Sequence, residues 1–167
     1  MKERMLRLQQ VQINNFKNVR QGQVDFNSYK SEDFFSKTSD VLGIYGQNGS
    51  GKTAFIEALW LLKMVLLGES LPGNIKDYIY QGEKEAAINA VFSMSLGENK
   101  YQLFYEMVIE RRENAAPVII KEDLSYKKLE EDGWTYKRGI ITHNLDDKEQ
   151  LLSPQKNYNL LTKNNKD

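Results

Sequence analysis

One run of eight residues combines three glycines with a lysine and a threonine in a fixed order. It fits the pattern of a glycine, four residues, a second glycine, a lysine and then a serine or threonine. Glycines let backbone N–H groups approach a polyphosphate closely, because no Cβ atom blocks the way. The lysine adds a mobile charge for the β and γ phosphates, and the threonine hydroxyl is a ligand for Mg²⁺. We therefore expect a phosphate loop, with Thr53 as its metal ligand, made of Gly46, Gln47, Asn48, Gly49, Ser50, Gly51, Lys52 and Thr53.

The segments on both sides of the phosphate loop must hold it in place. Residues 41–45 form a short apolar run that predicts a buried strand, and residues 53–67 have the spacing of an apolar helix that Gly68 ends. A helix that begins near Gly51 would present unpaired N–H groups and the positive end of its dipole to an anion. Such an apolar helix is expected to lie between two layers. Its broad apolar face comprises Phe55, Ile56, Leu59, Leu62, Leu66 and Leu67.

The chain before the loop predicts two strands. Residues 6–8 and 11–13 alternate apolar with polar, and the change of phase between them indicates a β-bulge. Residues 14–18 then form a turn, residues 21–26 a second strand, and residues 27–40 a polar surface loop.

The chain after residue 84 changes to a period of two. Residues 88–96 and 101–109 predict the arms of a hairpin that turns at residues 97–100. Further strands are expected at residues 117–126 and 134–142. No helical pattern separates these strands, so they should form an antiparallel meander.

Composition describes a globular chain with no global charge. The 167 residues contain 23 basic and 23 acidic side chains and no cysteine, which gives no net attraction for nucleic acid or membrane and excludes disulfides. The N-terminus lacks a signal region, and the longest apolar stretch, residues 58–67, is too short to span a bilayer. We expect a cytoplasmic protein with no membrane partner.

The acidic half of a nucleotide hydrolase has no clear counterpart. Such enzymes usually add a strand of four apolar residues that ends in an acid. Residues 118–120 lead instead to Lys121, so Glu122 and Asp123 are interpreted as solvated strand residues. The lone His143 is expected on the surface. Three basic pairs lie at expected strand ends and turns, and we interpret them as solvent-exposed side chains; contact with nucleic acid is the alternative. The pairs are Arg111-Arg112, Lys127-Lys128 and Lys137-Arg138.

Residues 15–18, 44–53 and 55–59 together resemble the head domain of ABC-type ATPases of the SMC and RecF group. In style they are nearest to bacterial "AAA family ATPase" proteins related to the overcoming-lysogenization-defect (OLD) family. The resemblance is good over residues 1–67 and general beyond them. It implies an α/β fold: a P-loop NTPase lobe with a mixed sheet around one buried helix, joined to an antiparallel β-meander subdomain.

The resemblance also implies a division of the chain and a set of partners. Residues 1–82 would form the P-loop core and residues 83–145 the β subdomain, while the tail at 146–167 leads to a C-terminal lobe. In relatives that lobe carries the signature motif, the acidic strand and a switch histidine, and two heads close around two ATP molecules. Lys17 and Asn18 would lie near the nucleotide, and Gln155 would be the Q-loop glutamine. DNA is a further expected partner, in DNA maintenance or phage defence.

Three functions stay open. The first is an ATPase lobe that dimerises on ATP and Mg²⁺ and hydrolyses ATP once the missing half is supplied. The second is a nucleotide-binding interaction module without turnover. The third is a small-molecule kinase or a GTPase, although residues 164–167 resemble the base-reading motif of GTPases only superficially.

Overall fold

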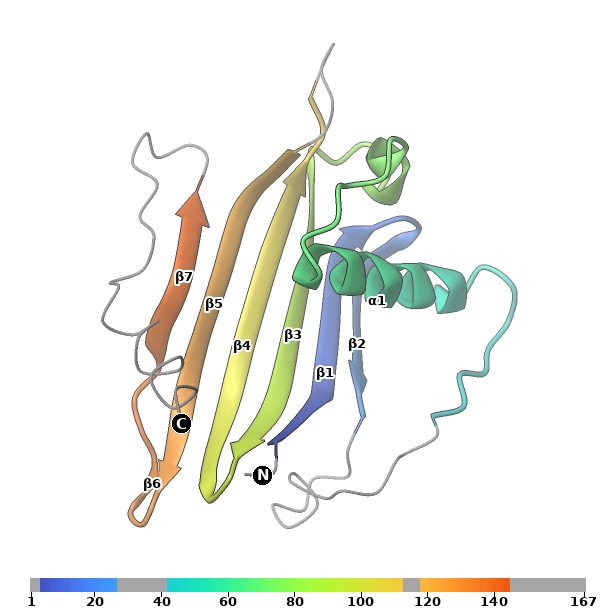
Figure 1. Cartoon of the computed structure of the whole chain (residues 1–167). Coiled ribbons are helices and arrows are strands. Elements are labelled where there is room, and N and C mark those ends of the chain that lie inside the picture. The colour runs from blue at the N-terminus through green and yellow to red at the C-terminus, as the bar shows by residue number, and fades with distance from the viewer. Residues whose placement is uncertain (1–3, 27–41, 113–117, 145–167) are drawn as a thin grey trace.

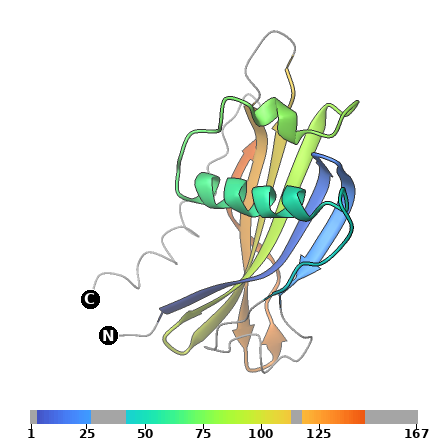
Figure 2. The same ribbon diagram turned by 90° about the vertical axis from the view of Figure 1, so that its right-hand side faces the viewer.

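The structure is a computed structural model that describes residues 4–26, 42–112 and 118–144. Within these residues the chain forms a seven-stranded sheet and one α-helix that crosses one face of it (Figure 1). Turned by 90°, the molecule shows a long twisted sheet with the helix on one side (Figure 2). The strands are β1 (Arg4–Phe16), β2 (Val19–Asp25), β3 (Glu85–Leu96), β4 (Asn99–Glu110), β5 (Val118–Glu130), β6 (Gly133–Trp134) and β7 (Arg138–Asn144). The helices are α1 (Lys52–Leu66) and the short 3₁₀ helix η2 (Ile75–Tyr78).

The sheet has the order β2-β1-β3-β4-β5, and both β6 and β7 pair with β5. The predicted hairpin is confirmed: β3 and β4 pair along their whole length, and Leu96 faces Asn99 across a two-residue turn. The predicted bulge is confirmed as well, since the register between β1 and β3 shifts between Leu8 and Gln10. The shift carries the apolar side of β1 from Leu8 to Val11, which lets one strand follow the twisted sheet.

The last predicted strand, residues 134–142, is divided in two. Trp134 faces Leu129 of β5, the chain then leaves the ladder, and Arg138 resumes pairing opposite Tyr126. A second register shift, between Leu124 and Ser125, accompanies β7. The predicted antiparallel meander therefore forms, but its last strand is replaced by two short strands, β6 and β7, which both pair with β5.

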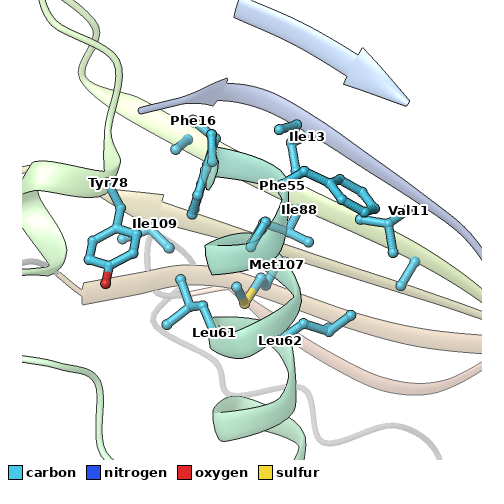
Figure 3. Packing of buried hydrophobic residues seen from close by; sticks show 14 of the residues in the cluster. Val11, Ile13, Phe16, Phe55, Leu61, Leu62, Tyr78, Ile88, Met107 and Ile109 are labelled. Atoms are coloured by element: carbon cyan, nitrogen blue, oxygen red, sulfur yellow. The ribbon is translucent and has the colours of Figure 1, made fainter. Parts of the chain in front are cut away.

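The main core lies between α1 and the upper part of the sheet (Figure 3). Strand residues of one face meet helix residues spaced three and four apart, which is the face that a helix presents to a sheet. Each buried aliphatic or aromatic side chain contributes about 1.5–3 kcal/mol relative to an exposed one. The members with at most 2% exposure are Val11, Ile13, Phe16, Ala54, Ala58, Leu61, Ile75, Ala86, Ile88, Ala90, Met107 and Ile109.

The expected burial of α1 between two layers is wrong for the described part of the chain. The helix buries Ala54, Phe55, Ala58, Leu61 and Leu62 against the sheet. The opposite side is open: Ile56 is 58% exposed and Trp60 is 45% exposed, and Leu66 and Leu67 are also exposed. The sequence gives α1 a broad apolar face, and only the part of it that faces the sheet is covered.

The expected strand at residues 41–45 is also wrong where it is described. Residues 42–47 have no strand pairing, and Leu42, Ile44 and Tyr45 are exposed, Tyr45 by 93%. A strand needs a neighbour for its backbone N–H and C=O groups. All strand pairs of the described residues are antiparallel and belong to the sheet under α1, so the partner strands of a mixed sheet are not among them.

The two parts of the expected domain division share one sheet, because β1 pairs with β3 over ten positions. The division at residues 82 and 83 stays a prediction. In the described part of the chain, no helix combines the length and the apolar character that crossing a membrane requires.

Candidate functional site

The phosphate loop connects the exposed segment 42–47 to the first turn of α1, at the helix end nearest β1 and β2 in Figure 1. The helix begins at Lys52, after Gly51 in the left-handed conformation, and the Phe55 N–H donates to the Gly51 carbonyl at 2.9 Å. No side chain caps this end and no acid lies in the first turn. The N–H groups of Lys52, Thr53 and Ala54 therefore lack intrahelical acceptors and face an anion-binding position.

Lys52 folds back over the loop that precedes it. Its Nζ atom donates to the carbonyl oxygens of Gly46 at 2.5 Å and Gln47 at 2.6 Å, and to the Ser50 hydroxyl at 3.3 Å. An ammonium group has three N–H donors, so these three acceptors use all of them. The contacts close the loop into a ring and hold a positive charge at its centre.

Two glycines fit positions where a side chain would collide or strain the backbone. A Cβ atom on Gly46 would lie 2.7 Å from the Ser50 hydroxyl oxygen. Gly51 has a φ of 90°, and a Cβ atom there would lie 2.6 Å from the Val19 Cγ2 atom. The loop therefore packs directly against its own serine on one side and against the start of β2 on the other. The close approach of the loop to a polyphosphate, which the sequence pattern predicts, stays a prediction.

The turn between β1 and β2 contacts the phosphate loop and the helix after it. The Asn18 Nδ2 group donates to the Gly49 carbonyl at 2.8 Å. Lys17 forms an ion pair with Glu57 of α1, and its Nζ atom lies 4.7 Å from the centre of the Tyr78 ring. Asn18 thus contacts the phosphate loop, while Lys17 contacts α1 and η2. The expected position of Lys17 and Asn18 near a nucleotide stays a prediction.

Sequence reasoning did not identify Glu57 or Tyr78 as neighbours of the site. Glu57 is the one acid within α1, and an isolated acid in an apolar helix is a signal that a cation lies nearby. Tyr78 gave no signal, since it comes from η2 and reaches Lys17 only through the fold.

The acids of β5 lie in the sheet and not at the loop. Glu122 accepts a hydrogen bond from the Tyr105 hydroxyl at 2.8 Å, and Asp123 accepts one from Thr142 at 3.3 Å. Burial, followed by the hydrogen bond to Glu122, raises the pKa of Tyr105 well above its ordinary value. Lys121 pairs with Glu106 at 2.7 Å. The interpretation of Glu122 and Asp123 as strand residues agrees with these contacts. Across the described residues, no group of three His, Cys, Asp or Glu side chains is placed to hold a metal ion.

Five residues of the basic pairs, namely Arg111, Arg112, Lys127, Lys128 and Lys137, contact other residues of the chain. Arg111 donates to the carbonyls of Lys76 and Ile79, which ties η2 to the end of β4. Lys127 and Lys137 both lie over the ring of Phe104, at 5.6 and 5.0 Å from its centre. Arg112 pairs with Glu110, and Lys128 with Glu130.

Some expectations fall outside the described residues. These are the surface loop at 27–40, Gln155 as the Q-loop glutamine, the tail at 146–167 and the GTPase-like run at 164–167. The backbone of His143 pairs with Glu122 in the ladder between β5 and β7, near the end of β7 as expected for a strand end.

Comparison with known families gives one match, which covers almost the whole chain. A family model described as an AAA domain matches residues 10–166, a span that contains the phosphate loop, α1 and strands β2 to β7. No curated protein matches the chain.

Proposed function

Because the chain belongs to the AAA domain family, a family of P-loop ATPase-type domains, we propose that it binds ATP together with Mg²⁺ through residues 46–53. The observation that carries the proposal is the position of Lys52. Its ammonium group and the open N-terminus of α1 meet at the same glycine-rich loop. Positive charge and unpaired N–H groups are the two features that a polyphosphate requires.

Each part of the loop has a role in this proposal. The backbone N–H groups from Gly46, Gln47, Asn48, Gly49, Ser50 and Gly51 surround the phosphates. Lys52 moves from the loop carbonyls to the β and γ phosphates, where it keeps its charge-assisted hydrogen bonds. Thr53, exposed in the first turn of α1, supplies one oxygen ligand to Mg²⁺, and phosphate oxygens are further ligands of the kind that Mg²⁺ prefers. Bound Mg²⁺ would neutralise charge on the phosphates.

We further propose that the chain is the N-terminal half of an ATPase head of the SMC, RecF or OLD kind. Two apolar surfaces lie beside the loop and are exposed: the outer side of α1 around Ile56 and Trp60, and the segment 42–45. Exposed apolar surface of this kind often marks an interface. A C-terminal lobe that carries the acidic strand would cover both of them and complete the sheet around residues 42–45. Heads completed in this way would dimerise on ATP and hydrolyse it, in DNA repair or in phage defence.

A binding module without turnover is the second candidate. It is favoured by the contacts of Glu122 and Asp123, which are engaged within the sheet. A water molecule at the γ phosphate needs an acid or a comparable group to orient it. On this proposal the isolated chain binds ATP and hydrolyses little of it.

The test is nucleotide binding by calorimetry, with and without Mg²⁺, for the wild type and for Lys52→Ala. We expect Lys52→Ala to weaken MgATP binding about 10- to 100-fold, because it removes charge-assisted hydrogen bonds to phosphate. The matched control is Lys63→Ala, which removes an exposed lysine from the same helix and should leave the affinity unchanged. Unchanged affinity in Lys52→Ala would contradict the proposed site. A phosphate-release assay separates the two candidates when it is run with and without an added C-terminal lobe. Turnover that appears only with the added lobe supports the half head, and no turnover in either mixture supports the module. Sustained turnover by the wild-type chain alone would contradict both.

A further inference from the structure

One side-chain hydrogen bond joins the phosphate loop to a distant part of the chain. The amide of Asn18, in the turn between β1 and β2, donates to the carbonyl oxygen of Gly49 across 31 positions of sequence. The next residue, Val19, packs behind Gly51, where a Cβ atom would lie 2.6 Å from its Cγ2 atom. The turn therefore contacts the loop at its tip and at its exit into α1.

The turn that carries Asn18 is itself held by backbone hydrogen bonds. The Lys17 N–H donates to the Tyr78 carbonyl at 2.7 Å, and the Tyr80 N–H donates to the Asn15 carbonyl at 2.8 Å. Asn15 and Lys17 have φ angles of 48° and 53°, a conformation that non-glycine residues adopt where surrounding contacts hold it. Asn18 therefore projects from a fixed platform.

Lys52 is tied to the same loop through all three of its donors. Its three donors are used by Gly46, Gln47 and Ser50, so an incoming phosphate must take at least one of them. The loop then loses an internal contact at the moment when its N–H groups must converge on the ligand. The contact from Asn18 to Gly49 does not compete with phosphate, because it uses a carbonyl oxygen, which an anion does not bind.

We propose that Asn18 is a positioning residue that keeps the phosphate loop in its binding shape when Lys52 moves from the loop to the phosphates. This inference rests on the proposed function. Asn18 acts on the loop and touches neither the base nor a particular phosphate. Loss of the Asn18 side chain should therefore weaken the binding of MgATP, MgADP and inorganic tripolyphosphate by the same factor.

The experiment compares Asn18→Ala and Asn18→Asp with the wild type, by calorimetry with all three ligands. For Asn18→Ala we expect affinity to fall about 3- to 10-fold for each ligand, the value of one hydrogen bond. Asn18→Asp keeps the size of the side chain but loses the N–H donor. Its carboxylate also lies against the Gly49 carbonyl oxygen and repels it, so the affinity should fall further than in Asn18→Ala. Gln21→Ala, an exposed change on β2, is the control with unchanged affinity.

A second measurement separates positioning from general folding. Amide hydrogen exchange should show Gly51 protected by ligand in the wild type and less protected in Asn18→Ala. Without ligand, the thermal unfolding midpoint of Asn18→Ala should equal that of Gln21→Ala, because the Asn18 side chain is exposed and its loss costs little stability.

Three results would overturn the inference. Wild-type affinity in Asn18→Ala, with Lys52→Ala defective, would remove the role of Asn18 and leave the proposed function intact. A loss confined to MgATP would place Asn18 at the γ phosphate instead of behind the loop. A wild type that binds none of the ligands would reject the proposed function, and the role of Asn18 with it.

Discussion

Gly51 connects the phosphate loop to α1 at a point where a larger residue would collide with Val19 of β2. Its φ of 90° turns the loop into α1, and Val19 occupies the space where a side chain would begin. The sequence pattern requires a glycine here for the approach of phosphate, and the fold requires one for its own packing. The proposed binding and the observed packing would therefore depend on the same missing Cβ atom.

Gly51→Ala should damage both properties. The left-handed backbone costs an alanine about 1–2 kcal/mol, and the contact with Val19 forces the loop or β2 to move. We expect a lower free energy of unfolding by urea and an MgATP affinity weakened at least about 10-fold, since the loop N–H groups would shift.

Two further variants separate strain from collision. Gly51→Ala combined with Val19→Ala removes the Cγ2 atom and should recover part of the affinity, while the backbone strain remains. Gly68→Ala is the matched control, because Gly68 has a φ of 72° and open space where its Cβ atom would stand. It should lose stability and keep wild-type affinity; equal binding defects in Gly51→Ala and Gly68→Ala would contradict the argument.

At the scale of elements, the features that sequence patterns predicted are those that depend on residues close together in the chain. The hairpin of β3 and β4 followed from a period of two and from Gly97, whose φ of 61° fits a two-residue turn. The phosphate loop followed from eight consecutive residues. In each case the residues that decide the structure are neighbours in sequence.

Long-range contacts explain where the sequence was insufficient. The run at 41–45 has the composition of a strand, but pairing needs a partner, and no described strand lies beside residues 42–45. An apolar helix does not reveal which side meets the sheet, so the predicted face included Ile56, which is exposed, and did not name Leu61, which is fully buried. The contact from Asn18 to Gly49 spans 31 residues and has no sequence signature.

The contact between Tyr105 of β4 and Glu122 of β5 predicts how the stability of the fold depends on pH. Tyr105 is buried and donates to Glu122, and both effects favour its neutral form, so its pKa is raised from an ordinary value of 10.0. The unfolded chain releases this proton near pH 10 while the folded chain keeps it. The stabilising contribution of Tyr105 is therefore complete below pH 10 and is lost as the pH rises toward its folded pKa.

Urea unfolding at several pH values from 8 to 11.5 measures this loss. Above about pH 10 the wild type should lose up to about 1.4 kcal/mol of unfolding free energy per pH unit more than Tyr105→Phe does. A residual slope is expected in the variant, because burial and the neighbouring Tyr126 also raise the pKa of Tyr101. The control is Tyr136→Phe at an exposed position, which should follow the wild type. Parallel curves for the wild type and Tyr105→Phe would show that this tyrosine does not titrate differently on folding.

At the scale of the whole molecule, α1 has one covered side and one open side. Its inner side closes the main core against β1, β3 and β4. Its outer side and the segment 42–45 both expose apolar side chains, and we assign both to contact with a C-terminal lobe. If this assignment is right, the described part of the chain folds without that cover, and the two sides of one helix differ sharply in their sensitivity to substitution.

Leu61→Ala and the double variant Ile56→Ser, Trp60→Gln measure this difference by urea unfolding. Leu61 is fully buried, so its truncation should cost about 2–5 kcal/mol. The double variant removes more apolar surface, but from exposed positions, and should change the free energy of unfolding by no more than about 1 kcal/mol. It should also reduce any self-association seen by sedimentation, since exposed apolar surface drives association. A double variant as unstable as Leu61→Ala would mean that the chain itself covers the outer side of α1, and the surface would then not be free for a second lobe.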